Sequence, residues 1–222
     1  VTHSTRYTYS APVSQCWNQA CLLPRETAHQ KCLSSELQIS PTASDVRERT
    51  DFFGNRITHF AIQNSHKELQ VTAISDISVV PDPHILLRAN LQGWDSLRKR
   101  LATEKDPARL KSLLYFYDSP MVFRAESLAE YAKPSFQGDR PLIEAVQDLM
   151  QRIYQDFTYD PAVTTIATPL LDVLRTKRGV CQDFAHLGVG CLRSIGLAAR
   201  YVSGYIETLP APGKERLVGA DA

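Results

Sequence analysis

The hydrophobic pattern of this chain changes at residues 81–84, PDPH, and this change restricts the possible folds more than any other feature. Up to about residue 80, apolar and polar side chains alternate with a period near two, which is typical of strands with one buried face. After PDPH, apolar residues recur at helical spacing and β-branched residues become less frequent. The sequence therefore predicts an α+β chain, with a β-rich domain over residues 1–82 and a second domain over residues 83–222.

Four segments of the first domain have the pattern of strands. The clearest is ELQVTAISDISVVP, residues 68–81, in which apolar residues occupy alternate positions. FFGN, residues 52–55, has the composition of a turn that uses Gly54 and Asn55 for positive φ. Short strands joined by such turns predict an antiparallel, sandwich-like module. The other three segments are THSTRYTYS, CLSSELQIS and RITHFAIQ, residues 2–10, 32–40 and 56–63.

The second domain begins with a helical region. The strongest helical pattern is RPLIEAVQDLMQRIYQDF, residues 140–157, where Pro141 suits the first turn. TPLLDVL indicates another helix, with Thr168 as N-cap and Pro169 as its first residue. Weaker patterns occur in WDSLRKRLA, ARLKSLLYFY and AESLAEYA, residues 94–102, 108–117 and 125–132. The stripe expected to be buried in the strongest helix is Leu142, Val146, Leu149, Ile153 and Phe157.

The composition is that of an ordinary globular protein. The 222 residues are 43% hydrophobic and 22% charged, enough for a core without a disulfide or metal scaffold. A formal net charge of +1 gives no electrostatic reason to expect nucleic acid or an anionic membrane as a partner. Five cysteines without CxxC spacing predict neither a disulfide framework nor a zinc site. No signal peptide or spanning helix is recognisable, so a cytoplasmic location is expected.

CQDFAHLGVGCLRSI, residues 181–195, predicts the helix that carries the chemistry. Gly179 interrupts the chain before it, and Gly196 follows as a C-terminal cap. Most of its circumference is apolar, which indicates a central, buried helix with Cys181 in its first turn. The following segment, AARYVSGYIE, is rich in Tyr, Val and Ile and predicts a strand over residues 198–207.

A thiol in a first turn has two possible roles. Unpaired amides and the macrodipole of a helix N-terminus stabilise anions, and thiols there can ionise well below the free pKa of about 8.5. The cysteine's own amide is also free to stabilise an oxyanion, and Lys177 and Arg178 would help if they face the thiol. However, a cysteine in an apolar context is more often a small core residue. Local physics leaves both roles open for Cys181.

The helix does not supply its own base. His186 lies about 140° and Asp183 about 200° from Cys181 around the helix axis, so neither side chain faces the thiol. We interpret His186 as a packed or hydrogen-bonded histidine and Asp183 as a polar anchor for the loop before the helix. The other four cysteines, Cys16, Cys21, Cys32 and Cys191, are interpreted as packing residues. The remaining histidines, His3, His29, His59, His66 and His84, are expected at the surface.

Several motifs resemble a known family. GVCQDFAH followed by LRSIGLAARYVSGY is similar to the core of the bacterial transglutaminase-like superfamily, whose members are often described as cysteine proteases. The segments TYSAPV, LLPRET, LQISP, TDFFGNRITHF and LQVTAISDISV resemble the β-rich region that precedes this core. Together the motifs extend over nearly all of the chain.

The resemblance implies a papain-like core, in which a cysteine at a helix N-terminus packs on an antiparallel sheet. It assigns the nucleophile to Cys181, with a histidine on a following strand as base and an aspartate on a later strand orienting it. The family pattern places both partners just after ERLVGADA, beyond Ala222, so we expect this chain to be a fragment of a longer protein. Asp221 precedes the expected histidine and is not its orienting partner.

The expected function is cysteine-dependent acyl transfer on amide bonds of a protein or peptide, through a thioester at Cys181, incomplete in this chain. The family favours peptidase or amidase activity over crosslinking. No metal or organic cofactor is expected, because thiol–imidazole chemistry needs none. The alternative is a catalytically inactive protein-interaction module. If the sheet of the core is incomplete, its exposed edge would favour a homodimer.

Overall fold

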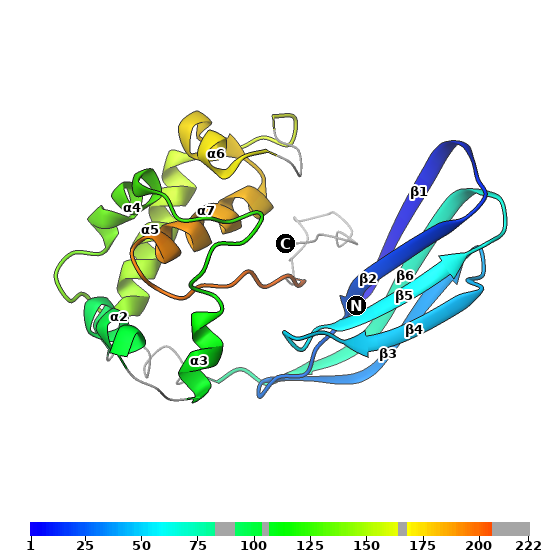
Figure 1. The fold of residues 1–222 in the computed structure, drawn as a ribbon, viewed down its shortest axis with the longest axis horizontal. Coiled ribbons are helices and arrows are strands. Elements are labelled where there is room, and N and C mark those ends of the chain that lie inside the picture. Colours follow the sequence, from blue (N-terminus) through cyan, green and yellow to red (C-terminus); the bar gives the residue numbers. More distant parts are fainter. Residues whose placement is uncertain (83–91, 104–106, 164–167, 206–222) are drawn as a thin grey trace, which may run out of the picture. The chain divides into compact units, whose positions relative to one another are not determined.

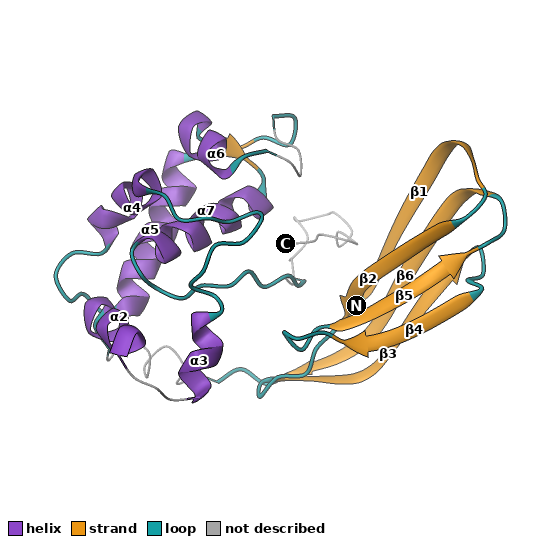
Figure 2. Cartoon of the chain, in the orientation of Figure 1, coloured by secondary structure: helices purple, strands orange, loops and turns teal. Residues whose placement is uncertain are grey.

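A computed structural model describes residues 1–82, 92–103, 107–163 and 168–205. The described residues form two compact units, one within residues 1–82 and one within residues 92–205 (Figure 1). In these ranges no helix is both long and apolar enough to cross a membrane. Strands make up the first unit and helices dominate the second (Figure 2). The predicted α+β class is therefore confirmed.

The first unit contains two three-stranded antiparallel sheets. Apolar side chains from both sheets form its core, centred on Phe60, Ile62, Leu69 and Val71, which confirms the predicted sandwich-like module. One sheet has the order β1 (Thr2–Val13), β6 (His66–Val79), β3 (Gln30–Ser40), and the other β2 (Cys16–Leu23), β5 (Arg56–Ile62), β4 (Asp45–Thr50).

The turn before β5 corrects one detail of the sequence analysis. Gly54 has the expected positive φ, +80°. Asn55 does not, because its conformation is set by Asp51 instead. The Asp51 carboxylate accepts the Asn55 backbone N–H at 2.7 Å and its side-chain amide at 2.9 Å. Backbone hydrogen bonds also close the turn, from the Gly54 N–H to the Asp51 carbonyl and from the Asp51 N–H to the Asn55 carbonyl, so it forms without a second residue in the left-handed region.

Three helices of the second unit pack against a fourth, α7 (Cys181–Ser194), as Figure 1 shows. Leu128, Leu149, Val173, Leu187 and Cys191 of four helices are at most 1% exposed and form the centre of this core. The expected central position of the last helix is therefore confirmed. The helices are α2 (Trp94–Thr103), α3 (Pro107–Leu113), α4 (Glu126–Ala132), α5 (Leu142–Asp156), α6 (Leu170–Thr176) and α7 (Cys181–Ser194), with a 3-10 turn η1 (Lys133–Ser135).

The end of α7 has the predicted glycine cap. Gly196 has φ +91°, its N–H donates to the Arg193 carbonyl, and the Leu197 N–H donates to the Leu192 carbonyl. These two bonds form a Schellman motif, and the buried Leu197 completes it. A left-handed residue is required here, which explains why glycine occupies position 196.

Two boundaries differ from the sequence analysis. The N-cap of α6 is Pro169 and not Thr168, so the helix begins one residue later than predicted. Residues 198–204 do not form the expected strand, and Tyr205 contributes a single bridge. A strand requires a neighbouring strand for its hydrogen bonds, and none pairs with 198–204 in the described part of the chain.

Candidate active site at the start of α7

A short parallel pairing fixes the chain just before α7. α6 ends at Thr176, and its C-cap, Lys177, has a left-handed conformation with φ 56°. β8 (Arg178–Gly179) then pairs in parallel with β7 (Thr158–Tyr159). The Thr158 N–H donates to the Lys177 carbonyl at 2.8 Å, and the Asp160 N–H donates to the Gly179 carbonyl at 2.9 Å. The backbone that leads into α7 is therefore held on both sides of Arg178.

Asp183 anchors the first turn of α7, as the sequence analysis predicted. Its Oδ2 accepts the backbone N–H of Val180, the N-cap residue, at 2.8 Å, and the side chain is buried. A Cβ on Gly179 would lie 2.8 Å from the same oxygen. Glycine at 179 thus leaves room for the carboxylate that closes the turn.

Cys181 is the first residue of α7 and is exposed. The first hydrogen bond of this helix runs from the Phe184 N–H to the Val180 carbonyl. The amides of Cys181 and Gln182 precede it, so they have no acceptor within the helix. An anion on the Cys181 sulfur, or on a substrate oxygen beside it, would meet the positive end of the helix. The geometry suits a nucleophilic thiol.

The two basic residues before the helix, Lys177 and Arg178, interact with other groups rather than with this thiol. The Lys177 Nζ lies 4.2 and 4.3 Å from the ring centroids of Tyr131 and Phe157, and burial lowers the pKa of its ammonium group. The Arg178 guanidinium forms an ion pair with Asp160 at 2.6 Å. Both arrangements stabilise the loop rather than the sulfur, and neither could be seen in the sequence.

The other polar groups of α7 have structural roles. The half-buried His186 ring lies 5.3 Å from that of Tyr201, and burial lowers the pKa of the imidazole. Cys191 is completely buried, which raises the pKa of its thiol to about 12. Both observations confirm the interpretation of these residues as packed. Among the described residues, no side chain forms a hydrogen bond with the Cys181 sulfur.

A buried arginine fixes the other end of α7. The Arg193 side chain donates to the Ala199 carbonyl at 3.1 Å, the Ser119 hydroxyl at 3.2 Å and the Val122 carbonyl at 3.4 Å. It therefore holds the segments before α4 and after α7 against the same helix. Sequence reasoning gave no signal for this contact, because Arg193 occupies a position that pattern analysis assigns to the surface.

Two expectations for the first unit are wrong. Cys21 is exposed, because alternation along β2 points it away from the core, so it is not a packing residue. His66 is only 7% exposed and not at the surface, and its ring packs edge-on against that of Tyr9. Cys16 and Cys32 are half-buried. His29 is exposed, His3 and His59 are half-buried, and His84 lies outside the described residues.

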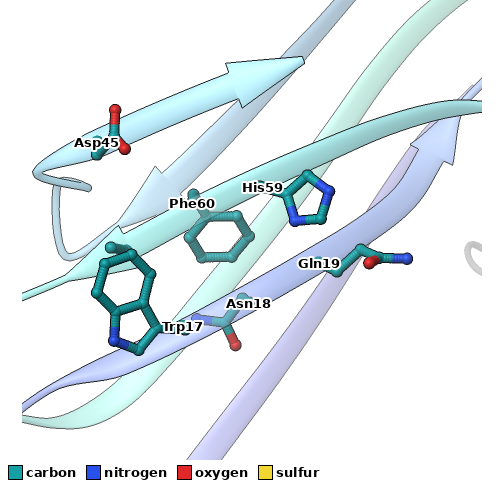
Figure 3. Close-up of a pocket in the computed structure, with 7 residues that line it drawn as sticks. Trp17, Asn18, Gln19, Asp45, His59 and Phe60 are labelled. Carbon is teal, nitrogen blue, oxygen red and sulfur yellow. The ribbon is translucent and has the colours of Figure 1, made fainter. Parts of the chain in front are cut away.

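The first unit also has a shallow pocket of about 230 Å³ on the sheet that contains β2, β5 and β4 (Figure 3). Trp17, Ala61 and Asp45 form one cross-strand row, with the small Ala61 between the exposed indole and the carboxylate. None of the residues predicted to form a catalytic site lines this pocket. The lining residues are Trp17, Asn18, Gln19, Asp45, His59, Phe60 and Ala61.

Comparison with known proteins places both units in one family. Residues 1–78 match the model of the bacterial transglutaminase-like N-terminal region. Residues 129–216 match the transglutaminase-like superfamily, and this range includes all of α7. The matches correspond to the strand-rich and helical parts of the chain.

Four similar proteins come from mycobacteria. Uncharacterized proteins of Mycobacterium tuberculosis and Mycobacterium bovis are each 40% identical over the whole chain, which covers 70% of their length. A protein of Mycobacterium leprae is 29% identical over 99% of the chain and 73% of its own length. A crystal structure of a "putative cysteine protease" from Cytophaga hutchinsonii has the same fold, with a TM-score of 0.70 at 20% identity. The match covers 92% of this chain and 65% of that one.

Proposed function

The chain belongs to the transglutaminase-like superfamily, and from this premise we propose that Cys181 is the nucleophile of a cysteine-dependent acyl transfer on amide bonds. The observation that carries this proposal is the exposed thiol at the first residue of a buried helix, where the nearest amides have no intrahelical acceptor. The substrate class is a protein or peptide. The name of the Cytophaga hutchinsonii protein is consistent with this chemistry.

In the proposed reaction, the Cys181 thiolate attacks the amide carbonyl carbon and forms a carbon–sulfur bond. The carbonyl electrons move to oxygen, and the Cys181 N–H donates a hydrogen bond to this oxyanion. Collapse of the tetrahedral species breaks the carbon–nitrogen bond, and the amine leaves with the proton that the thiol lost. Water then cleaves the thioester and releases a carboxylic acid.

The proton carrier in this proposal is a histidine downstream of Ala222. His186 does not suit the role, because it points away from Cys181 and its ring packs on Tyr201. The mycobacterial relatives are longer than this chain, which covers 70% of their length. Asp183 positions Cys181 by holding Val180 and takes no part in proton transfer.

We favour hydrolysis over transfer to a second amine. The lysine nearest to Cys181 in sequence, Lys177, is held against the rings of Tyr131 and Phe157, so it does not act as an internal acceptor for the thioester. Thiol-dependent hydrolysis needs neither a metal ion nor an organic cofactor.

The proposal is tested by iodoacetamide alkylation across a pH series, with the modified cysteines identified by peptide mapping. Cys21 is the matched control, since it is exposed but lies on a strand. We expect Cys181 to react at lower pH than Cys21, and faster still in a longer chain that includes the native residues after Ala222. Equal reactivity of the two thiols in both chains would instead favour a catalytically inactive interaction module.

A further inference from the structure

A second thiol and an imidazole meet in the first unit. Cys16 begins β2 and His66 begins β6, fifty positions apart, yet the Cys16 Sγ lies 3.6 Å from the His66 Nε2. This separation is that of a hydrogen bond involving sulfur. His66 is almost completely buried, whereas Cys16 is half-buried.

The partners of His66 determine the direction of this hydrogen bond. Its Nδ1 lies 2.8 Å from the Asn64 carbonyl oxygen, and a carbonyl only accepts. Nδ1 therefore carries the proton, and in the neutral ring Nε2 has a free electron pair directed at the sulfur. The Cys16 thiol donates to this nitrogen. An edge contact with the Tyr9 ring, with centroids 5.7 Å apart, restrains the imidazole further.

Asn18 completes the surroundings of the sulfur. Its Nδ2 donates to the Cys16 Sγ at 3.2 Å, and an N–H donor stabilises a sulfur that has lost its proton. The thiol thus has an acceptor for its proton and a donor for the resulting charge. Nucleophilic cysteines have the same two requirements.

Cys32 provides the contrast within the same unit. It is also half-buried, but its thiol donates to the Ser34 carbonyl oxygen at 3.4 Å, and a carbonyl does not remove a proton. A purely structural thiol needs only such an acceptor. The imidazole of His66 is therefore the feature that distinguishes Cys16 from Cys32.

We propose that Cys16 is a modification site, at which the thiol forms a mixed disulfide with a low-molecular-weight disulfide. His66 Nε2 accepts the Cys16 proton, and the thiolate attacks one sulfur of the reagent. The new sulfur–sulfur bond forms as the old one breaks, and the leaving thiolate takes the proton from His66. The exchange needs no other oxidant, and it does not depend on the chemistry at Cys181.

The test is a reaction of the folded chain with dipyridyl disulfide at neutral pH, below the molar amount of protein, followed by peptide mapping. We expect Cys16 to be modified about tenfold faster than Cys32. His66→Gln removes the proton acceptor and should bring the rate at Cys16 down to that of Cys32, with Cys32 unchanged. Equal rates at Cys16 and Cys32 in the unaltered chain would overturn the proposal.

A second variant separates reactivity from structure. Asn18→Ala should slow Cys16 by about threefold through loss of one hydrogen bond to the thiolate, and it remains informative if His66→Gln does not fold. A modification rate at Cys16 that Asn18→Ala leaves unchanged would contradict the mechanism.

Discussion

The two cysteines of α7 show how position within one helix determines the chemistry of a side chain. Cys181 occupies the first residue, exposed and next to amides without intrahelical acceptors. Cys191 lies in the middle, completely buried, with the pKa of its thiol raised to about 12. Cys181 therefore lies in a site suited to a thiolate anion, whereas the site of Cys191, ten residues later, disfavours one. In the proposed function the start of this helix serves chemistry, whereas its buried part serves packing.

The largest expected effect comes from exchanging each cysteine for alanine in a chain that includes the native downstream residues. Cys181→Ala should lower amide hydrolysis on the order of 10³-fold or more without affecting stability. Cys191→Ala should retain the rate and lower the free energy of unfolding by roughly 1 kcal/mol, because a small cavity replaces the sulfur. Peptide hydrolysis measures the rate in both variants, and urea denaturation measures their free energy of unfolding. A large loss of activity in Cys191→Ala but not in Cys181→Ala would show that Cys191, and not Cys181, is required for catalysis.

The packing role of the middle of α7 is tested at its glycines. A Cβ on Gly190 would lie 3.0 Å from Leu170 Cδ2 and 3.1 Å from Leu128 Cδ1, and both leucines are buried. Gly190→Val should therefore lower the free energy of unfolding by about 1–3 kcal/mol through overpacking.

Gly188→Ala is the matched control, because the nearest atom to its Cβ, on Ile153, lies 3.9 Å away. It should be neutral or stabilise by up to about 1 kcal/mol through helix propensity. Thermal unfolding of both variants distinguishes them. A Gly190→Val protein as stable as Gly188→Ala would show that the core around α7 has spare volume.

The anchor at the start of α7 should have a smaller effect on stability and a specific effect on the thiol. Asp183→Ala removes the acceptor of the Val180 N–H and should lower the free energy of unfolding by roughly 1–2 kcal/mol. Alkylation of Cys181 should slow in this variant, while that of Cys21 should not change.

Asp183→Asn is the control for this variant, since its amide oxygen still accepts the Val180 N–H. It should retain most of the stability. If Cys181 in the folded Asp183→Ala protein is alkylated at the original rate, the carboxylate supports the fold without positioning the thiol.

The smallest effect concerns pH and His186. Burial lowers the pKa of this imidazole below its ordinary value of 6.5, although Asp183 acts in the opposite direction. The folded state therefore binds fewer protons than the unfolded state, and stability is lost as pH falls from about 6.5 toward the folded pKa. His186→Gln should make this decline shallower between pH 7 and pH 5 in urea denaturation. An unchanged slope would assign the acid sensitivity to other groups.

Local signals in the sequence were sufficient to predict α7. Gly179, Gly196 and the absence of proline or a polar run between them gave its ends, and angular spacing identified Asp183 as an anchor rather than a base. These features depend on neighbours within a few residues. For the same reason the glycine cap at Gly196 and the first-turn position of Cys181 followed from the chain alone.

Contacts between distant residues could not be predicted in this way. Lys177 was expected to assist Cys181 if it faced the thiol, but its ammonium group packs on Tyr131, forty-six positions earlier. β4, DVRERT, escaped detection because all six residues are exposed and show no alternation. The pair of Cys16 and His66 brings together two residues to which sequence reasoning gave unrelated roles.

The buried Arg193 has a consequence for the order in which the second unit folds. Its guanidinium reaches partners 71 and 74 positions earlier in the chain as well as Ala199, six positions later. Closing such a loop costs entropy before any bond forms, and a buried cation without its acceptors is strongly disfavoured. Intermediates that contain α7 without the segment at Ser119–Val122 are therefore unstable. Native-state hydrogen exchange should find these two regions opening together, as one cooperative unit.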